Sequence, residues 1–153
     1  MAVEMKVKVV TFDPSRDGFV VLLSDLENTH ALPIWIGPFE ANAIALKLRN
    51  TNLHRPMTHD LIRNILAVFD SEIVKIEVMD FKRNIYYAQI HIKADGKEIT
   101  IDSRPSDAIA VALAAGAPIY VNESVLSKVK TIQLDKLEEF LENLNPEDFK
   151  YKT

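Results

Sequence analysis

The chain has 153 residues, the size of one ordinary domain, and its sequence contains no cysteine. This composition excludes disulfides, thiolate metal sites and cysteine nucleophiles. The net charge is −4, but residues 1–130 are nearly neutral, with 15 basic and 16 acidic side chains. Clustered Lys and Arg normally supply the affinity for nucleic-acid phosphates, so the composition argues against a tight nucleic-acid binder.

Targeting signals are not evident in the sequence. The N-terminal residues lack the basic start and the apolar core of a signal peptide. No apolar run approaches the ~20 residues that a membrane-spanning helix needs. We therefore expect a cytoplasmic protein that does not contact a membrane.

The first part of the chain predicts three strands followed by a helix. Residues 5–12 alternate between apolar and polar side chains, as in a half-buried strand. The continuous apolar run 19–23 predicts a central strand, and residues 30–36 predict a third strand. Pro38 begins a helix that reaches about Arg49, because proline is tolerated in a first helical turn.

Residues 50–71 predict a polar loop and a short helix, which we interpret as an insertion. Thr58 has the side chain of a helix N-cap, and the helix is predicted from His59 to about Phe69. Its apolar residues recur at helical spacing and are expected to be buried. They are Leu61, Ile62, Ile65, Leu66 and Phe69.

The remaining residues predict three further strands and several helices. Strands are expected over 73–81 and 85–93, and Asp95-Gly96 indicates a hairpin into a third strand that ends near Ile101. A helix then begins at Pro105. A short extended piece, 119–121, and one or two helical turns follow. Residues 131–153 predict an acidic amphipathic helix and tail that packs on the body or on a partner, with apolar positions Leu134, Leu137, Phe140, Leu141 and Leu144.

The sequence contains an internal similarity at an offset of 67 residues. Residues 34–46 align without a gap on 101–113, so that Pro38 meets Pro105 and Glu40 meets Asp107. We infer two tandem β-β-β-α repeats over about 5–49 and 72–116. The predicted fold is α+β, with a mostly antiparallel sheet or a partly closed barrel and helices packed on it. Residues 1–130 would form this domain, and 131–153 the acidic C-terminal helix and tail.

The start of the second repeat helix carries a dense group of polar residues. Asp102, Arg104 and Asp107 surround Pro105, at a helix end whose free N–H groups attract anions. Acids in a first helical turn also stabilise a helix by about 0.3–1 kcal/mol, so Glu40 and Asp107 could serve only as caps. Asp102 and Arg104 replace Trp35 and Gly37 of the first repeat, which favours either a functional role or an ion pair at this corner.

A second polar group lies at the start of the inserted helix. His59 and Asp60 follow His54 and Arg55 by a short distance in the sequence. Histidine can transfer protons near neutral pH, and carboxylates can bind a divalent cation that polarises a phosphodiester. Adjacent residues cannot share one helix face, so this pair alone is no recognised metal-ligand signature.

Four motifs together carry a family resemblance. They are L-P-I-W-I-G at 32–37 with Glu40-Ala41, R-P-M-T-H-D-L at 55–61, I-D-S-R-P-S-D-A at 101–108 and P-I-Y-V at 118–121. In this order they closely resemble the bifunctional nuclease family over about residues 5–125. The resemblance implies an α+β domain that tends to form homo-oligomers, in a family whose named activity is cleavage of RNA and DNA. The positions that it points to are Glu40, His59, Asp60, Asp102, Arg104 and Asp107.

The leading hypothesis is therefore a nuclease-like hydrolase of RNA and DNA phosphodiesters. Asp102 and Asp107 would bind a divalent metal ion such as Mg or Mn, Arg104 would meet a phosphate oxygen, and His59 would transfer the proton. The alternative is a non-enzymatic oligomeric binding or regulatory module, most simply a dimer. The near-neutral body, the acidic tail and the lack of a recognised metal-ligand spacing favour it. Two departures from the family pattern also count against nucleic-acid affinity. Ala114-Ala115 replaces an expected basic residue, and the tail is a short acidic helix where some relatives carry another domain.

Overall fold

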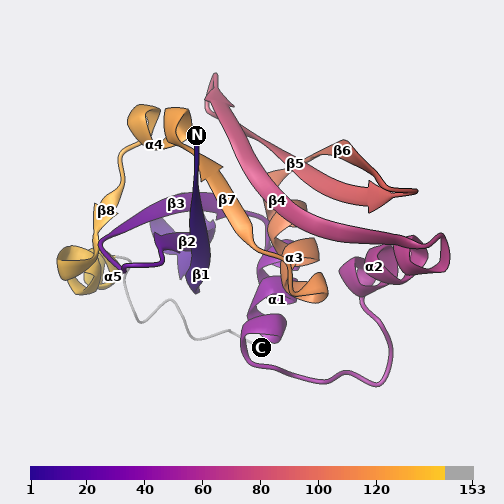
Figure 1. Ribbon diagram of the computed structural model, residues 1–153. Helices are drawn as coiled ribbons and strands as arrows, with labels where there is room; N and C mark the ends of the chain where they lie inside the picture. Colours follow the sequence, from indigo (N-terminus) through magenta and orange to yellow (C-terminus); the bar gives the residue numbers. More distant parts are fainter. Residues whose placement is uncertain (144–153) are drawn as a thin grey trace.

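The computed structural model describes residues 1–143, and within them it contains eight strands, five α-helices and two short 3₁₀ helices (Figure 1). The N-terminal half comprises β1 (Ala2–Asp13), η1 (Pro14–Arg16), β2 (Gly18–Asp25), β3 (His30–Ile36), α1 (Pro38–Leu48) and α2 (Thr58–Val68). The C-terminal half comprises β4 (Ser71–Lys82), β5 (Ile85–Ala94), β6 (Lys97–Ser103), α3 (Pro105–Ala115), β7 (Ile119–Asn122), α4 (Glu123–Lys128), β8 (Ile132–Gln133), η2 (Leu134–Lys136) and α5 (Leu137–Asn143). The first strand starts earlier than predicted, because residues 2–5 pair with β7.

All eight strands belong to one sheet, in the order β6-β5-β4-β7-β1-β2-β3-β8. Neighbouring strands are antiparallel, except that β4 and β7 run parallel. The predicted α+β fold with a mostly antiparallel sheet and packed helices is confirmed. The alternative of a partly closed barrel is wrong, because the edge strands β6 and β8 remain apart and β8 is too short for more than two residue pairs.

The two halves of the chain have the same order of elements. Three consecutive strands, β1 to β3 and β4 to β6, are each followed by a helix that begins at a proline, α1 or α3. In the sheet, each group of three strands extends outward from the central β7. An internal duplication would produce this arrangement, and the duplication itself stays a prediction.

The main core lies between the sheet and the helices α1 and α3. Val21 and Leu23 of β2 belong to it, together with Ile44 of α1 and Ile109 of α3. Val20 and Leu22 alternate with them along β2 and belong to a second cluster on the opposite face. Because β2 is buried on both faces, its sequence is a continuous apolar run, as predicted for a central strand.

The C-terminal segment covers that second face. Leu137, Phe140 and Leu141 of α5 pack against Val20 and Leu22, and β8 pairs with the start of β3. The predicted amphipathic helix therefore packs on the body of its own chain. Leu144 and the predicted polar tail lie outside the described residues, and the predicted domain boundary after residue 130 stays a prediction.

The start of α2 differs from the prediction. Met57 is the N-cap and Thr58 is the first helical residue, because the carboxylate of Asp60 accepts the Met57 N–H at 3.1 Å and takes over the capping role. Only one side of α2 contacts α3 and β4. Ile62 and Leu66 pack on the core from this side, whereas the other predicted core positions of the helix, Leu61, Ile65 and Phe69, are exposed.

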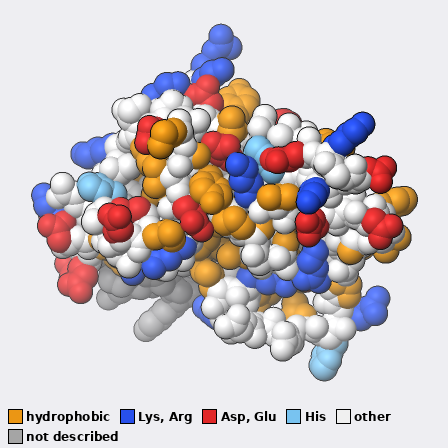
Figure 2. All heavy atoms as spheres, viewed as in Figure 1, with side chains coloured by type: hydrophobic (Ala, Val, Ile, Leu, Met, Phe, Trp, Pro, Cys, Tyr) orange, Lys and Arg blue, Asp and Glu red, His pale blue; other side chains and the backbone are white. Residues whose placement is uncertain are grey.

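The surface carries charges of both signs. Figure 2 shows Lys and Arg side chains interspersed with Asp and Glu over the visible face of the molecule. This distribution agrees with the near-neutral composition of residues 1–130. Within residues 1–143, none of the helices is long and apolar enough to cross a membrane.

Candidate active site at the starts of three helices

The candidate site begins with two helix starts that lie next to each other. Helices α1 and α3 pack together, and each has proline at its first position. The third residue of each helix is an acid, Glu40 in α1 and Asp107 in α3. Both carboxylates therefore lie at the positive end of a helix dipole, where negative charge is favourable.

Arg104 connects these two acids. It is the N-cap residue of α3 and donates from Nε and Nη2 to Asp107 Oδ2, at 3.0 and 2.8 Å. Its Nη2 also donates to Glu40 Oε1 at 3.1 Å. The hydrogen bonds and charge of Asp107, with a smaller contribution from Glu40, raise the pKa of Arg104. The side chain is 66% exposed, and within residues 1–143 Nη1 makes no hydrogen bond, so this nitrogen is free to bind a ligand oxygen.

Gly37 explains how Glu40 reaches Arg104. Gly37 is the N-cap of α1, the position that Arg104 occupies in α3. A Cβ atom on Gly37 would lie only 2.5 Å from Glu40 Oε2. The carboxylate of Glu40 therefore folds back over the glycine, into space that any other residue would fill.

His59 joins the group from α2. Its Nε2 lies 3.1 Å from Asp107 Oδ1, and its side chain is only 12% exposed. Burial raises the pKa of Asp107, but hydrogen bonds from His59 and Arg104 and the charge of Arg104 outweigh burial and leave that pKa below its usual value. An ionised carboxylate only accepts hydrogen bonds, so Nε2 carries the proton and neutral His59 has its lone pair on Nδ1.

Asp60 points to a different group of residues. It forms an ion pair with Lys47 Nζ at 2.5 Å and accepts the Met57 N–H. Burial raises the pKa of Asp60, but these contacts and the charges of Lys47 and Arg63 outweigh it and leave the pKa below its usual value. Asp60 therefore ties the end of α1 to the start of α2.

Asp102 also lies apart from the cluster. It is exposed near the end of β6 and pairs with Gln89, which alternates along β5 with the core residues Ala88 and Ile90. Opposite residues of paired strands point to the same face, so the Asp102 side chain points away from α3. Its carboxylate makes no hydrogen bond or ion pair with the rest of residues 1–143.

The structure thus brings together four of the six predicted residues, Glu40, His59, Arg104 and Asp107, which we call the His59 cluster. Both oxygens of Asp107 are already engaged within it. Among residues 1–143, no three or more His, Asp or Glu side chains are grouped as metal ligands. The metal site at Asp102 and Asp107 stays a prediction, and no chemical step below depends on it.

Sequence reasoning missed Gly37, Lys47 and Arg63. Arg63 Nη1 donates to the carbonyl oxygen of Ala114 at 2.7 Å. Its guanidinium therefore lies at the end of α3, where the sequence lacks the basic residue expected at Ala114-Ala115. The sequence spacing could have identified Arg63, because Arg63 follows His59 by four residues and therefore lies on the same face of the helix.

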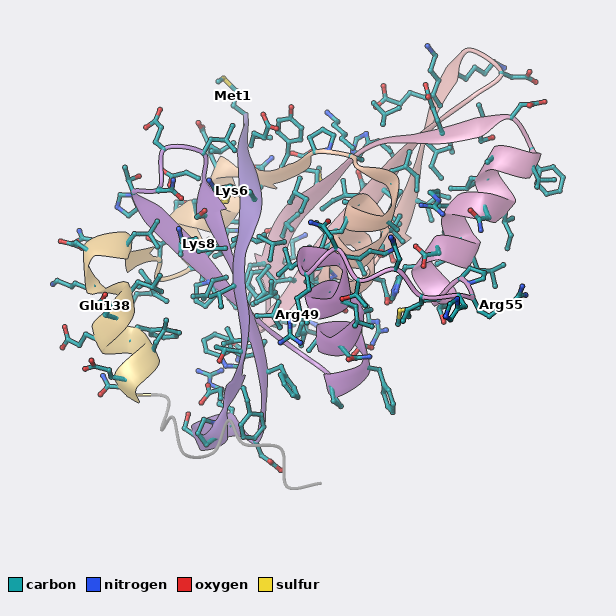
Figure 3. The ribbon with its side chains drawn as sticks, turned by 90° about the horizontal axis from the view of Figure 1, so that it is seen from below. Met1, Lys6, Lys8, Arg49, Arg55 and Glu138 are labelled. Atoms are coloured by element: carbon teal, nitrogen blue, oxygen red, sulfur yellow. The ribbon has the colours of Figure 1, made fainter. Side chains whose placement is uncertain are left out.

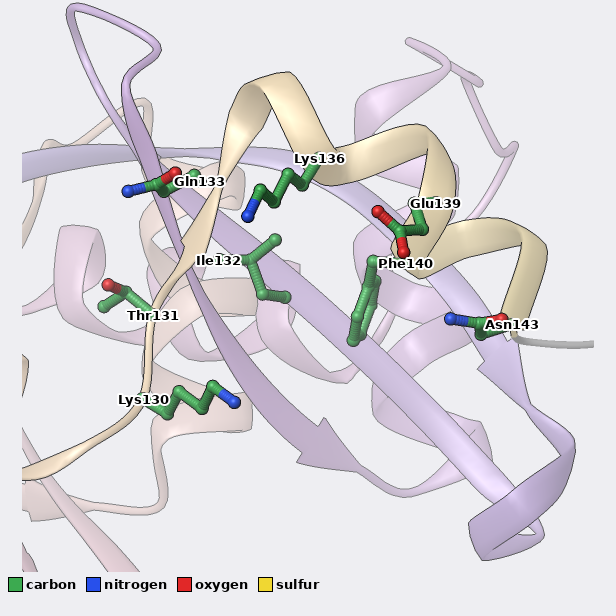
Figure 4. Close-up of a pocket in the computed structure, with 8 residues that line it drawn as sticks. All are labelled: Lys130, Thr131, Ile132, Gln133, Lys136, Glu139, Phe140 and Asn143. Atoms are coloured by element: carbon green, nitrogen blue, oxygen red, sulfur yellow. The ribbon is translucent and has the colours of Figure 1, made fainter.

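Among residues 1–143, two of the cavities lie outside the cluster. One, of about 360 Å³, lies between the end of α1, the loop into α2 and the start of α2; Figure 3 shows Arg55 in that loop and Arg49 beside the end of α1. The other, of about 470 Å³, lies between β8 and α5, with Ile132 and Phe140 in its wall (Figure 4). The second cavity contains none of the predicted site residues, whereas Asp60 lines the first.

Known proteins similar to this chain agree with the sequence motifs. The family model described as the bifunctional nuclease domain matches residues 21–133. An uncharacterized protein of Mycobacterium tuberculosis is 33% identical over 163 residues, which cover 96% of this chain and 98% of that protein.

Two plant proteins share a shorter region. Bifunctional nuclease 1 of Oryza sativa subsp. indica is 25% identical over 97 residues, or 61% of this chain and 29% of the rice protein. Bifunctional nuclease 2 of Arabidopsis thaliana is 24% identical over 95 residues, or 60% of this chain and 29% of the plant protein. The match with the domain model spans more than half of the chain, and the chain therefore belongs to the bifunctional nuclease domain family.

Proposed function

We propose that this protein hydrolyses the phosphodiester bonds of RNA and DNA at the His59 cluster. The observation that carries the proposal is the contact of His59 Nε2 with Asp107, whose other oxygen binds Arg104. A histidine oriented by a carboxylate, next to a guanidinium with a free nitrogen, combines a base with an oxyanion binder. The plant relatives named as bifunctional nucleases support the same assignment.

His59 is the proposed base. With its proton on Nε2 held by Asp107, the lone pair of Nδ1 can take a proton from water as that water attacks phosphorus. DNA lacks the 2′-hydroxyl that could attack in RNA, so one mechanism for both substrates needs water as the nucleophile. The P–O bond to the leaving oxygen then breaks, that oxygen takes up a proton from solvent, and protonated His59 returns its proton to solvent.

Arg104 is the proposed phosphate ligand. Its Nε and Nη2 are fixed by Asp107, and Nη2 also by Glu40, which leaves Nη1 for a non-bridging phosphate oxygen. A guanidinium matches phosphate geometry and keeps its charge at all working pH values. Glu40 and Asp107 are thus positioning residues for the cation that stabilises the developing negative charge.

A divalent metal ion such as Mg or Mn is a further component of the proposal. If bound, it would polarise the phosphate and lower the pKa of the attacking water. Its predicted ligands are Asp102 and Asp107, but the Asp102 side chain points away from α3 and both Asp107 oxygens are engaged, so the steps proposed at His59 and Arg104 do not depend on the ion. Inhibition by a chelator, reversed by added Mg²⁺ or Mn²⁺, would support this component, and full activity in chelator would contradict it.

The decisive experiment compares two carboxylate variants. Asp107→Asn should slow cleavage of fluorogenic single-stranded RNA and DNA by about 10²–10⁴-fold, the usual contribution of acid–base catalysis. Asp80→Asn is the matched control, because Asp80 also binds a basic side chain, Lys128, but lies on β4 outside the cluster. To exclude a contaminating nuclease, the cleavage activity must co-purify with the wild-type protein through a second purification step. Wild-type rates from a folded Asp107→Asn protein would refute the proposal.

A second candidate is a non-enzymatic binding module. In the His59 cluster every acidic side chain is paired with a basic one, and these pairs join α1, α2 and α3. Such a fully paired group can serve to hold the three helices together, which favours this candidate. In that case Asp107→Asn should lower the melting temperature, and the wild-type protein should show no activity that survives the second purification.

Self-association as a dimer is also proposed. The tail helix is used within its own chain, but α2 exposes Leu61, Ile65, Val68 and Phe69 on one side. A contiguous apolar helix face of this kind usually contacts another surface. Sedimentation at micromolar concentration tests the dimer.

The position of the cluster is an argument for internal duplication. The two helix starts present Glu40 and Asp107 at equivalent positions, as two copies of one β-β-β-α unit would. We propose that residues 5–49 and 72–116 are such copies. Superposition of their Cα atoms tests this, and a poor fit of α1 on α3 would contradict it.

A cytoplasmic location likewise stays a prediction.

A further inference from the structure

The cavity of about 360 Å³ at the start of α2 is lined by basic side chains that the proposed mechanism does not use. Lys47 comes from the end of α1, Arg55 from the loop and Arg63 from α2. His54 also lines it, and Asp60 is its one acid. We call this cavity the basic hollow.

The basic hollow has an excess of positive charge. Lys47 is neutralised by its ion pair with Asp60. Arg63 donates to uncharged acceptors, the Ala114 carbonyl and Asn64 Oδ1, and its charge also acts on Asp60, so one carboxylate opposes both Lys47 and Arg63. Arg55 is exposed and has no ion pair within residues 1–143. In a body that is otherwise nearly neutral, three basic side chains against one carboxylate leave an excess of positive charge around one cavity, which favours an anion.

The size of the hollow suits a small anionic group. About 360 Å³ is near the lower end of the range for small-molecule sites, roughly 300–1,000 Å³. Arginine binds phosphate oxygens with two parallel N–H groups, which gives geometric selectivity as well as charge.

The hollow is a neighbour of the His59 cluster. Asp60, in its wall, directly follows His59, and their Cα atoms are ~3.8 Å apart. Arg63, which also lines the hollow, follows His59 by one helical turn and lies on the same side of α2, so the hollow and the cluster adjoin along this helix. A nucleic-acid strand with one phosphate bound at Arg104 would then extend past the start of α2.

We propose that the basic hollow binds a backbone phosphate of single-stranded RNA or DNA, next to the phosphate that is cleaved. The inference rests on the proposed function and assigns Arg55 and Arg63 to substrate binding. Arg55 is the better test residue, because it is exposed and its replacement should not disturb packing. Arg63 holds the end of α3 and would confound binding with stability.

Binding should be measured by fluorescence anisotropy with labelled oligothymidylate and oligouridylate, in an Asp107→Asn background that prevents cleavage. Arg55→Ala should weaken the binding of oligothymidylate and of oligouridylate to the same extent. It should also reduce the steepness of a plot of the logarithm of the association constant against the logarithm of the salt concentration by about 0.7, the value for one lost phosphate contact on a single strand. Arg55→Lys should recover most of the slope. Lys93→Ala, which removes one exposed charge from β5, is the matched control and should leave the slope unchanged.

Equal effects of Arg55→Ala and Lys93→Ala, or no measurable strand binding, would overturn the inference. A titration with inorganic phosphate forms the second arm. Arg55-dependent binding of inorganic phosphate without an Arg55 effect on the strands would also overturn it, since the hollow would then be a free-phosphate site. Arg55-dependent strand binding by a wild-type protein that does not cleave would support the hollow and refute the proposed hydrolase.

Discussion

Replacing Gly37 by alanine is expected to lower activity with little change in stability. Gly37 has φ −76° and ψ 167°, an extended conformation that any residue adopts. At such a position Gly→Ala stabilises by about 0.4–1 kcal/mol through the unfolded chain. Alanine is also a poorer N-cap than glycine, by roughly 0.5–1 kcal/mol. These effects offset each other, so the melting temperature should change by less than about 2–4 °C.

The His59 cluster, by contrast, should lose a contact. The added Cβ would lie 2.5 Å from Glu40 Oε2, so the carboxylate must move. Arg104 binds the other oxygen, Oε1, so if the whole carboxylate withdraws, the 3.1 Å bond from Arg104 Nη2 breaks and Arg104 is then held by Asp107 alone. An exposed ion pair contributes about 0.2–1 kcal/mol, which corresponds to at most roughly a fivefold loss of kcat/KM. Misplacement of the guanidinium by ~1 Å would raise the loss to about 10²-fold.

The assay is a double-mutant cycle on kcat/KM for a fluorogenic single-stranded DNA, with wild type, Gly37→Ala, Glu40→Ala and the double variant. If Gly37→Ala acts by displacing Glu40, it should have no further effect once Glu40 is absent. Gly18→Ala is the matched control, because its added Cβ would meet its nearest neighbour, the Arg16 carbonyl oxygen, at 3.7 Å. The reasoning is refuted if Gly37→Ala keeps wild-type activity or costs the same in both backgrounds.

Three further outcomes are expected. Asp102→Asn should change the melting temperature by no more than about 1–2 °C, because Asp102 is exposed and unpaired within residues 1–143; unchanged cleavage would refute its role as a metal ligand. Asp107→Asn should lower the free energy of unfolding by about 1 kcal/mol at pH 5, and the deficit should shrink below about pH 4. The folded-state pKa of Asp107 is depressed, so its stabilisation is present above the unfolded-state pKa and is lost as pH falls; a deficit that is constant in urea titrations from pH 5 to 3 would contradict this. Phe69→Asp should convert a dimer to a monomer in sedimentation, with Glu72→Ala as a control, and a wild-type monomer at micromolar concentration would end the dimer proposal.

Most of the fold could be predicted from the sequence because its signals are local. Alternation, apolar runs and turn residues located the strands, and Pro38 and Pro105 located the starts of α1 and α3. The cap of α2 was misassigned because Asp60 accepts the Met57 N–H, a choice that depends on how the preceding loop is held. The exposed side of α2 was missed because an apolar residue on a helix does not indicate which neighbour covers it.

The cluster was only partly predictable, for a geometric reason. Glu40 and Asp107 were found because the internal similarity of the sequence aligns them, and both are the third residue of a helix. Asp102 is only five residues from Asp107, yet it points to the other face, because side-chain direction on β6 is set by its pairing with β5. Gly37 could not be predicted as a site residue because it has no functional group. It contributes by lacking a side chain, which leaves room for the carboxylate of Glu40.

The short strand β7 has a consequence for how the molecule forms. It pairs with β1 on one side, with Ala2 opposite Asn122, and with β4 on the other side. Among residues 1–143, the strand pairing that joins the two groups of three strands therefore runs through residues 119–122. During synthesis, both β1 and β4 are unpaired edges until this strand emerges, and closing a loop of more than a hundred residues is slow. A chain truncated before Ile119 should accordingly contain two small sheets whose exposed edges promote aggregation.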